Sequence, residues 1–232
     1  MSFFAQLVEA TQAERAYLLS APIILACQRG EVSLGRYVAF LTEAYHHVRH
    51  TVPLLMACGS RLGESHRWLQ DAITDYIEEE RGHDRWILND IQACGADADG
   101  VYHGQPSLAT ELMVSYAWDS VMRGNPVSFF GMVYVLEGTS VNLATPMAQL
   151  IQQKLALPEQ AMSCLYSHGS LDQEHIQFFR TLMEKLDDPA DQAAVIHMAK
   201  VMFQLYGNVF RSLPMDEISA VMDEEKGGQR GH

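Results

Sequence analysis

Apolar residues recur at helical spacing along almost all of the 232-residue chain, and no run alternates apolar with polar residues for the length of a strand. One clear example is the series Tyr37, Phe40, Leu41, Tyr45 and Val48. Residues three or four positions apart share one face of a helix, so such a series marks the face that packs against the core. With a hydrophobic content of 48%, the chain can build one sizeable core. The pattern predicts an all-α fold, a bundle of about seven or eight helices.

Cap, turn and proline residues divide this pattern into helices. The expected ranges are about 2–29, 33–58, 64–94, 107–123, from the Gly124-Asn125-Pro126 break to 155, 158–166, a helix that ends near 186, and 189–213. Pro22 is expected to break the first helix, and Pro53 to kink the second. We expect one helical domain over 1–213 and a flexible tail over 214–232.

Charge and cysteine content narrow the possible partners and the compartment. The chain has 16 Lys and Arg against 29 Asp and Glu, a net charge of −13, which argues against nucleic acid and anionic membrane surfaces as partners. Its four cysteines are scattered, with no CxxC pair, which is typical of reduced thiols. The first residues lack a signal-peptide pattern, so a cytoplasmic protein is expected. The least charged segment, 124–153, carries Glu137 at its centre and is interpreted as a buried helix rather than a membrane span.

A metal site is suggested by the segment 168–175, where His168, Asp172 and His175 follow one another at steps of four and three residues. On a helix these three side chains share one face. Nitrogen and oxygen donors that converge in this way suit iron, manganese or zinc. The alternative is an ordinary solvated helix face.

A second pair of candidate ligands lies in the run Glu78-Glu79-Glu80-Arg81-Gly82-His83. Glu80 precedes His83 by three residues and Glu79 precedes it by four, so either pair can share a helix face. Glu-x-x-His is the spacing with which carboxylate-bridged di-iron bundles offer one oxygen and one nitrogen from a single helix. A run of three glutamates can also be a solvated acidic face, and that interpretation holds for part of it.

Glu137 stands within an apolar stretch, Phe129 to Glu137, that should be buried on all sides. A buried carboxylate is costly unless it is paired, protonated or bound to a metal ion. Arg123 is the only basic residue near it in sequence, and it lies about four helical turns away. A metal ion answers this cost most directly; a neutral, hydrogen-bonded Glu137 is the alternative.

Taken together, these positions supply three carboxylates and three imidazoles from three separate helices. They are Glu80 (or Glu79), His83, Glu137, His168, Asp172 and His175. Six protein ligands are too many for one ion that keeps an open position, so the set suits two ions. Donors without thiolate favour iron or manganese over structural zinc.

With these motifs in order, the sequence resembles the haem-oxygenase-like di-iron oxidases and oxygenases, a branch of the haem oxygenase, TenA and PqqC structural superfamily. The resemblance covers residues 5–213 in helix order and length. Its specific part is Glu-x-x-His, then a lone Glu in Tyr134-Val135-Leu136-Glu137-Gly138-Thr139, then His-x3-Asp-x2-His. It implies that the six positions hold two iron ions. The family varies the Glu-to-His spacing, so Glu79 competes with Glu80.

Other branches of the superfamily fit the sequence less well. TenA-type thiaminases have a cysteine nucleophile in the helix that corresponds to 124–155, but this chain has no cysteine between Cys94 and Cys164. In addition, Ala44 stands where their aspartate aligns. Thiaminase activity is therefore not expected. The proximal histidine of haem oxygenase should lie on the first helix, and no histidine precedes His46. PqqC-type ring oxidation uses no metal and would leave the six positions unexplained.

The resemblance implies an enzyme that activates dioxygen to oxidise a small organic, amino-acid-like or fatty-acid-like substrate, and it implies a homodimer. Tyr134 is expected to act in catalysis, and Tyr45, His46 and Trp118 are expected in the substrate pocket. One alternative is a metal-free TenA- or PqqC-like protein that binds a small heterocyclic, thiamine- or quinone-related molecule. A ferritin-like four-helix bundle is another, although chain length and the number of helices argue against it.

Overall fold

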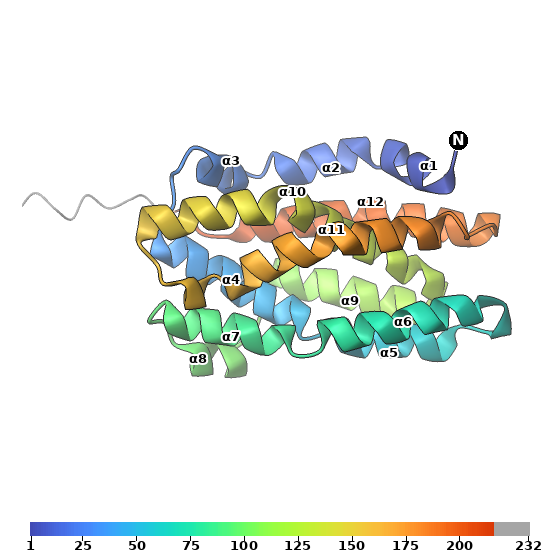
Figure 1. Ribbon diagram of the computed structural model, residues 1–232, viewed down its shortest axis with the longest axis horizontal. Helices are drawn as coiled ribbons and strands as arrows, with labels where there is room; N and C mark the ends of the chain where they lie inside the picture. Colours follow the sequence, from blue (N-terminus) through green and yellow to red (C-terminus); the bar gives the residue numbers. More distant parts are fainter. Residues whose placement is uncertain (216–232) are drawn as a thin grey trace, which may run out of the picture.

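The computed structural model describes residues 1–215, except the side chains of Asn142 and of residues 168–174. In this part of the chain all regular structure is helical (Figure 1). The α-helices are α1 Phe3–Ala10, α2 Gln12–Leu19, α3 Pro22–Gln28, α4 Leu34–Val48, α5 Thr51–Arg61, α6 Arg67–Glu80, α7 His83–Ala93, α8 Ala98–His103, α9 Leu108–Arg123, α10 Phe129–Leu155, α11 Ser163–Met183 and α12 Pro189–Ser212. The all-α prediction is confirmed. The helices outnumber the seven or eight expected, because three of the expected helices are broken and α8 forms where a loop was expected.

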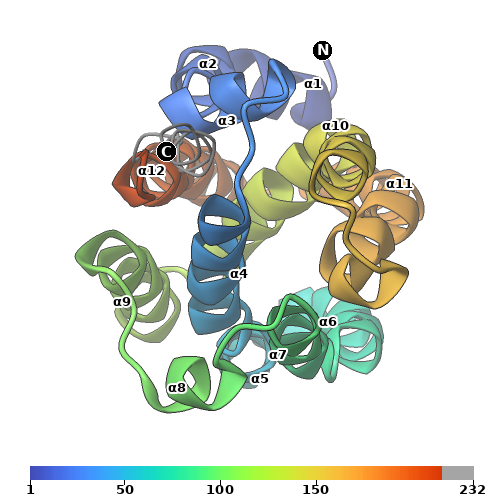
Figure 2. The same ribbon diagram turned by 90° about the vertical axis from the view of Figure 1, so that its left-hand side faces the viewer.

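The helices are arranged as a long bundle with one element inside it. Seen along the bundle, α4 lies within a ring formed by α9, α12, α10, α11 and the α6–α7 pair (Figure 2). The first half of α10 crosses the interior behind α4, and its buried residues Phe130 and Val135 belong to the larger apolar core. A second core gathers α4, α7 and the facing ends of α10 and α11. The helix α4 and the part of α10 behind it therefore have neighbours on several sides, which is where a buried site can form.

Three breaks fall where the sequence pattern predicted continuous helix, the first of them at Thr11 between α1 and α2. The helix expected over 33–58 ends at Val48 and restarts at Thr51, so Pro53 stands in the first turn of α5. A proline there lacks only an N–H that would have no helical partner anyway, so it need not kink the helix. The helix expected over 64–94 is broken at Gly82, whose φ of 99° is left-handed. Only glycine adopts this backbone conformation without strain, and it separates α6 from α7.

The long helix α10 is bent near its centre. The first part, Pro126–Val141, includes the short turn before α10, and it meets the second part, Leu143–Leu155, at 45°. Pro146 cannot donate the backbone hydrogen bond to the carbonyl four residues earlier, which is the usual cause of such a bend. Within the described residues no single helix has the length and apolarity to cross a membrane, although the two parts of α10 taken together do.

The start of α11 is fixed by a buried carboxylate on α7. Asp90 is fully buried and accepts hydrogen bonds from the backbone N–H of Cys164 at 2.8 Å and from the N–H and hydroxyl of Ser163. These N–H groups belong to the first turn of α11, where backbone N–H groups have no acceptor within their own helix. Burial raises the pKa of Asp90, and the hydrogen bonds from Ser163 and Cys164 oppose that effect. Asp90 thus sets where α11 begins and fixes it to α7.

Asp90→Ala is expected to lower the free energy of unfolding by about 2–3 kcal/mol, because it leaves N–H groups of the α11 first turn buried without an acceptor. Urea denaturation followed by circular dichroism measures the change, with the exposed neighbour Asn89→Ala as the control. A loss no larger than that of the control would show that the first turn of α11 finds other acceptors.

At the opposite end of the bundle, Asp191 in the first turn of α12 joins two other elements. Its carboxylate lies 2.7 Å from His66 Nε2 before α6 and accepts a hydrogen bond of 2.6 Å from the Asn125 side chain between α9 and α10. This carboxylate is buried, so its two partners hold the turns before α6 and α10 against the start of α12.

Candidate metal centre

Carboxylate and imidazole groups from α6, α7, α10 and α11 meet beside the break between α6 and α7. Glu80, the last residue of α6, lies with its Oε2 3.1 Å from Nδ1 of His83, the first residue of α7. Glu79 Oε2 lies 2.9 Å from His175 Nε2, and Glu137 Oε1 lies 3.8 Å from His175 Nδ1. These contacts bring together side chains that are separated by nearly one hundred residues in sequence.

The expectation that Glu80 and His83 share one helix is wrong, because Gly82 ends that helix between them. The reversal of the chain at this glycine nevertheless places the two side chains in contact. His83 is 2% exposed, and the side chain of Glu80 is 14% exposed. Their position depends on the turn rather than on helical periodicity.

The positions of 168–175 lie on α11, which is continuous from Ser163 to Met183. His175 is buried and contacts both Glu79 and Glu137. The side chains of His168 and Asp172 lie outside the described residues, so their role as ligands stays a prediction. Among the side chains that are described, no three of the His, Cys, Asp and Glu residues form a metal-binding group.

A cavity of about 200 Å³ opens beside these groups and extends between α4 and α10. Its wall is mainly apolar, but Glu80 and Glu137 are among the residues that line it, together with Tyr76. Glu137 is 8% exposed, so its carboxylate faces the cavity rather than bulk solvent. Two carboxylates in the wall of one apolar cavity are costly to bury as anions, and a bound cation or a proton offsets that cost.

Comparison with known families assigns the chain. A family model described as "iron-containing redox enzyme" matches residues 38–207, which is most of the sequence. The chain belongs to this family of iron-containing redox enzymes. The description of the family places the chain among iron-containing oxidoreductases. No curated protein sequence is a significant match.

Solved structures show the fold of this iron-containing redox enzyme. A domain of unknown function with a haem-oxygenase-like fold from Shewanella denitrificans is 22% identical, with a TM-score of 0.80 over 92% of each chain. A TenA homologue from Pseudomonas syringae is 13% identical, with a TM-score of 0.74 over 91% of each. The haem oxygenase of Leptospira interrogans is 19% identical, with a TM-score of 0.74 over 92% of this chain and all of that one. The haem-oxygenase/TenA-like fold is confirmed.

The donor groups of the centre fit the iron that the family name implies. The described groups are carboxylate oxygens and imidazole nitrogens, without a thiolate, which is a donor set that iron and manganese accept. Their carboxylates face a mainly apolar cavity, where a cation lowers the cost of burial. Glu80, Glu137, His83 and His175 are the described residues best placed to hold the iron of this redox enzyme, with Glu79 beside them.

The aromatic residues expected near the chemistry lie elsewhere in this redox enzyme. Tyr134 is buried among Phe4, Phe179 and Phe203, with ring centroids 5.8–6.2 Å away, and it does not line the cavity. A catalytic role for Tyr134 is therefore not supported. Helical spacing showed that its face of α10 is buried, but not which neighbours would cover it.

The three residues expected in the pocket do not line this cavity either. Tyr45 packs against Tyr102 of α8, and the Arg49 guanidinium lies 5.4 Å above its ring. His46 is buried beside Tyr45, and burial lowers its pKa. Trp118 donates a hydrogen bond to His50 at 3.2 Å. Tyr45 and Trp118 thus belong to contacts of α4 with α8 and of the α4–α5 turn with α9, because more than one face of α4 is buried.

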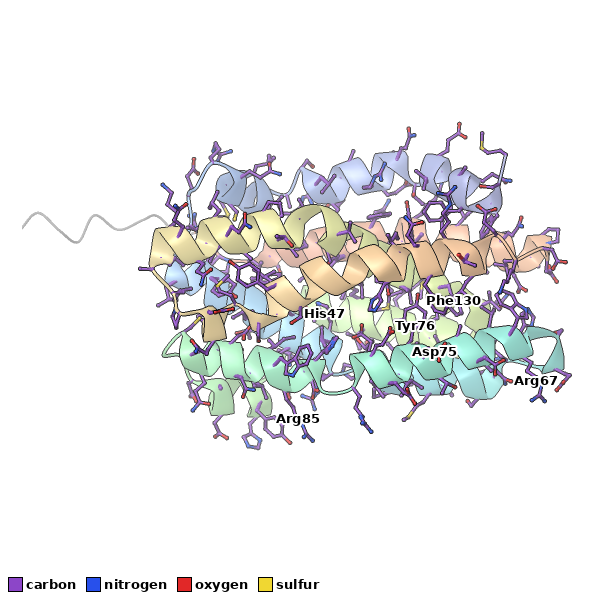
Figure 3. The ribbon with its side chains drawn as sticks, viewed as in Figure 1. His47, Arg67, Asp75, Tyr76, Arg85 and Phe130 are labelled. Carbon is purple, nitrogen blue, oxygen red and sulfur yellow. The ribbon has the colours of Figure 1, made fainter. Side chains whose placement is uncertain are left out.

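Tyr76 and His47 occupy the places that those residues were expected to take. Both line the cavity, and both are labelled in the interior of the bundle in Figure 3. The Tyr76 ring lies 6.3 Å from the His175 ring, and the His47 ring lies 5.6 Å from that of Tyr206. Tyr76 precedes Glu80 by one helical turn, and this spacing was the signal in the sequence that could have revealed it.

Proposed function

We propose that this redox enzyme is a non-haem di-iron oxidase or oxygenase that uses dioxygen to oxidise a small organic molecule held in the cavity. The observation that carries the proposal is the acidic part of the cavity wall. There Glu80 and Glu137 face an apolar space, with the imidazoles of His83 and His175 in contact with them. Bound iron would supply redox chemistry and a site for dioxygen.

The residues of the chain have separate tasks in this proposal. Glu80 and Glu137 present oxygen donors at the cavity wall, and His83 and His175 present nitrogen donors. Tyr76 brings a phenol to the same cavity wall, near His175, where it can orient a polar group of the substrate. The apolar lining excludes water and holds the substrate beside these carboxylates.

Metal content tests the proposal against two alternatives, a metal-free binding protein on the same fold and a haem protein. The chain is produced in iron-supplemented medium and purified without chelator, and its metals are measured by mass spectrometry. About two irons per chain are expected, as in other carboxylate-bridged centres, with manganese as the possible substitute. They should be absent from the His168→Ala, Glu137→Ala double variant.

A matched control replaces the same residue types on the surface. Glu78 and His197 are both exposed, so the Glu78→Ala, His197→Ala double variant should keep its iron. No bound metal after anaerobic reconstitution with ferrous iron would overturn the proposal in favour of the metal-free protein. Iron that gives a Soret absorbance band would instead identify haem. The homodimer expected from the sequence stays a prediction.

A further inference from the structure

Trp86 joins the candidate metal centre to the surface of the protein. It follows His83 by three residues on α7, so the two side chains share one face of the helix. Their ring centroids are 4.3 Å apart, with an angle of 31° between the ring planes. His83 is 2% exposed, whereas Trp86 is 38% exposed. One indole therefore contacts a buried candidate ligand and also reaches solvent.

No other aromatic ring combines these two properties within the described residues. The Tyr76 ring lies 6.3 Å from the His175 ring, but Tyr76 is only 2% exposed. Trp68 packs against the larger core, and Trp118 donates its hydrogen bond to His50. Neither of these two indoles is stacked on a candidate ligand. The indole on α7 is thus the aromatic link between the centre and solvent.

An indole suits the transfer of single electrons. Its π system is electron-rich, and it loses one electron far more readily than the phenyl ring of phenylalanine does. Electron transfer slows steeply with distance, so a ring in contact with the imidazole of a ligand is an efficient donor. When dioxygen has oxidised the iron and no substrate is present, the remaining oxidising power acts on groups in the cavity wall, among them the Tyr76 phenol, unless another donor supplies electrons.

We propose that Trp86 is an electron relay that protects the centre when the cavity holds no substrate. Trp86 gives one electron through His83 to the oxidised iron and becomes a radical cation. A one-electron reductant of the ascorbate class then returns an electron to the indole at the surface. In each step one group loses an electron and another gains it, and no bond forms or breaks. The inference rests on the proposed function, because it requires bound iron.

Oxidation of the protein in the absence of substrate tests this relay. The native chain is loaded anaerobically with ferrous iron and exposed to dioxygen without reductant. A Trp86 radical that is not reduced loses a second electron to the iron and adds water, so it gains one oxygen atom and releases two protons. Peptide mass spectrometry should find this oxygen at Trp86 at least about ten times as often as at Trp68 or Trp118, a difference of about 1.4 kcal/mol between the barriers. Ascorbate should suppress it.

Variants separate electron transfer from packing. Trp86→Phe keeps an aromatic ring beside His83 but resists oxidation, so the fold and the iron content should be unchanged. Rapid-freeze electron paramagnetic resonance should show a transient tryptophan radical in the native protein and none in Trp86→Phe. Trp68→Phe is the matched control and should keep the radical signal, because Trp68 packs against the core rather than on a candidate ligand. A purely structural role of Trp86 would not abolish the signal.

Oxidants that diffuse through the solvent are the competing explanation, and Met56 reports them. Met56 is 58% exposed, and exposed methionine is readily oxidised. It should gain less oxygen than Trp86. An equal gain at Met56, an equal gain at Trp68, or a radical that persists in Trp86→Phe would each overturn the proposal. With about two irons per chain, such a result removes only the relay. A chain that binds no iron loses the proposed function as well, so metal content distinguishes the two failures.

Discussion

Ferrous iron is expected to raise the unfolding temperature of the native chain by roughly 5–10 °C at free iron about one hundred times the dissociation constant. A ligand that binds only the folded state stabilises it, and the proposed ligands come from different helices that separate on unfolding. Glu137→Gln should lose most of this rise, because an amide is a poor ligand for iron. Anaerobic differential scanning calorimetry, with and without iron, measures both.

The same experiment measures how much the buried carboxylate of Glu137 lowers the stability of the iron-free fold. Without iron, Glu137→Gln should unfold at the same temperature as the native chain or higher, because it removes a buried charge and keeps the side-chain shape. Glu78→Gln, on the exposed face of α6, is the control and should keep the full response to iron. An equal rise in native and Glu137→Gln proteins would exclude Glu137 from the iron site.

Gly131→Val is expected to destabilise the protein by roughly 3–5 kcal/mol, because the added side chain would push apart two helices that pack closely at this glycine. A Cβ at Gly131 of α10 would overlap the Val195 carbonyl oxygen and lie 2.8 Å from the Ala199 backbone nitrogen, both on α12. Backbone atoms within a helix cannot move aside as a flexible side chain can. Urea denaturation should therefore show a lower midpoint for this variant.

The control for this prediction is Gly35→Ala in the first turn of α4, where an added Cβ meets no atom within 4 Å. That change should stabilise by up to about 1 kcal/mol, since alanine favours helix more than glycine does. If Gly131→Val were as stable as the native protein, α10 and α12 would have to pack less closely than the structure has them.

Several parts of the candidate site could be predicted because they depend on local chemistry. Glu137 was identifiable from the cost of burying a carboxylate in an apolar segment, and the structure places it at a cavity wall. Glu80 and His83 were paired from their spacing, and they do make contact, although across the turn at Gly82 instead of along one helix. Whether these residues bind iron is still a prediction.

Other parts could not be predicted, because a helical pattern shows that a face is buried without showing what buries it. Tyr134, Tyr45 and Trp118 are aromatic residues on packed helices, yet each contacts a neighbour outside the cavity. Tyr76 and His47 line the cavity. The spacing of Tyr76 from Glu80 is a signal for Tyr76, but nothing in the sequence neighbourhood of His47 separates it from ordinary core residues. Their position depends on how α4 and α6 pack against α10.

The sequence by itself determined the all-helical fold, since hydrophobic periodicity and capping act between residues a few positions apart. It also determined which carboxylates and imidazoles could serve as ligands. Only the tertiary structure decided that Glu79 contacts His175 and that Glu80 and Glu137 share one cavity. These relations join residues far apart in the chain, and they depend on helix crossings that no local pattern encodes.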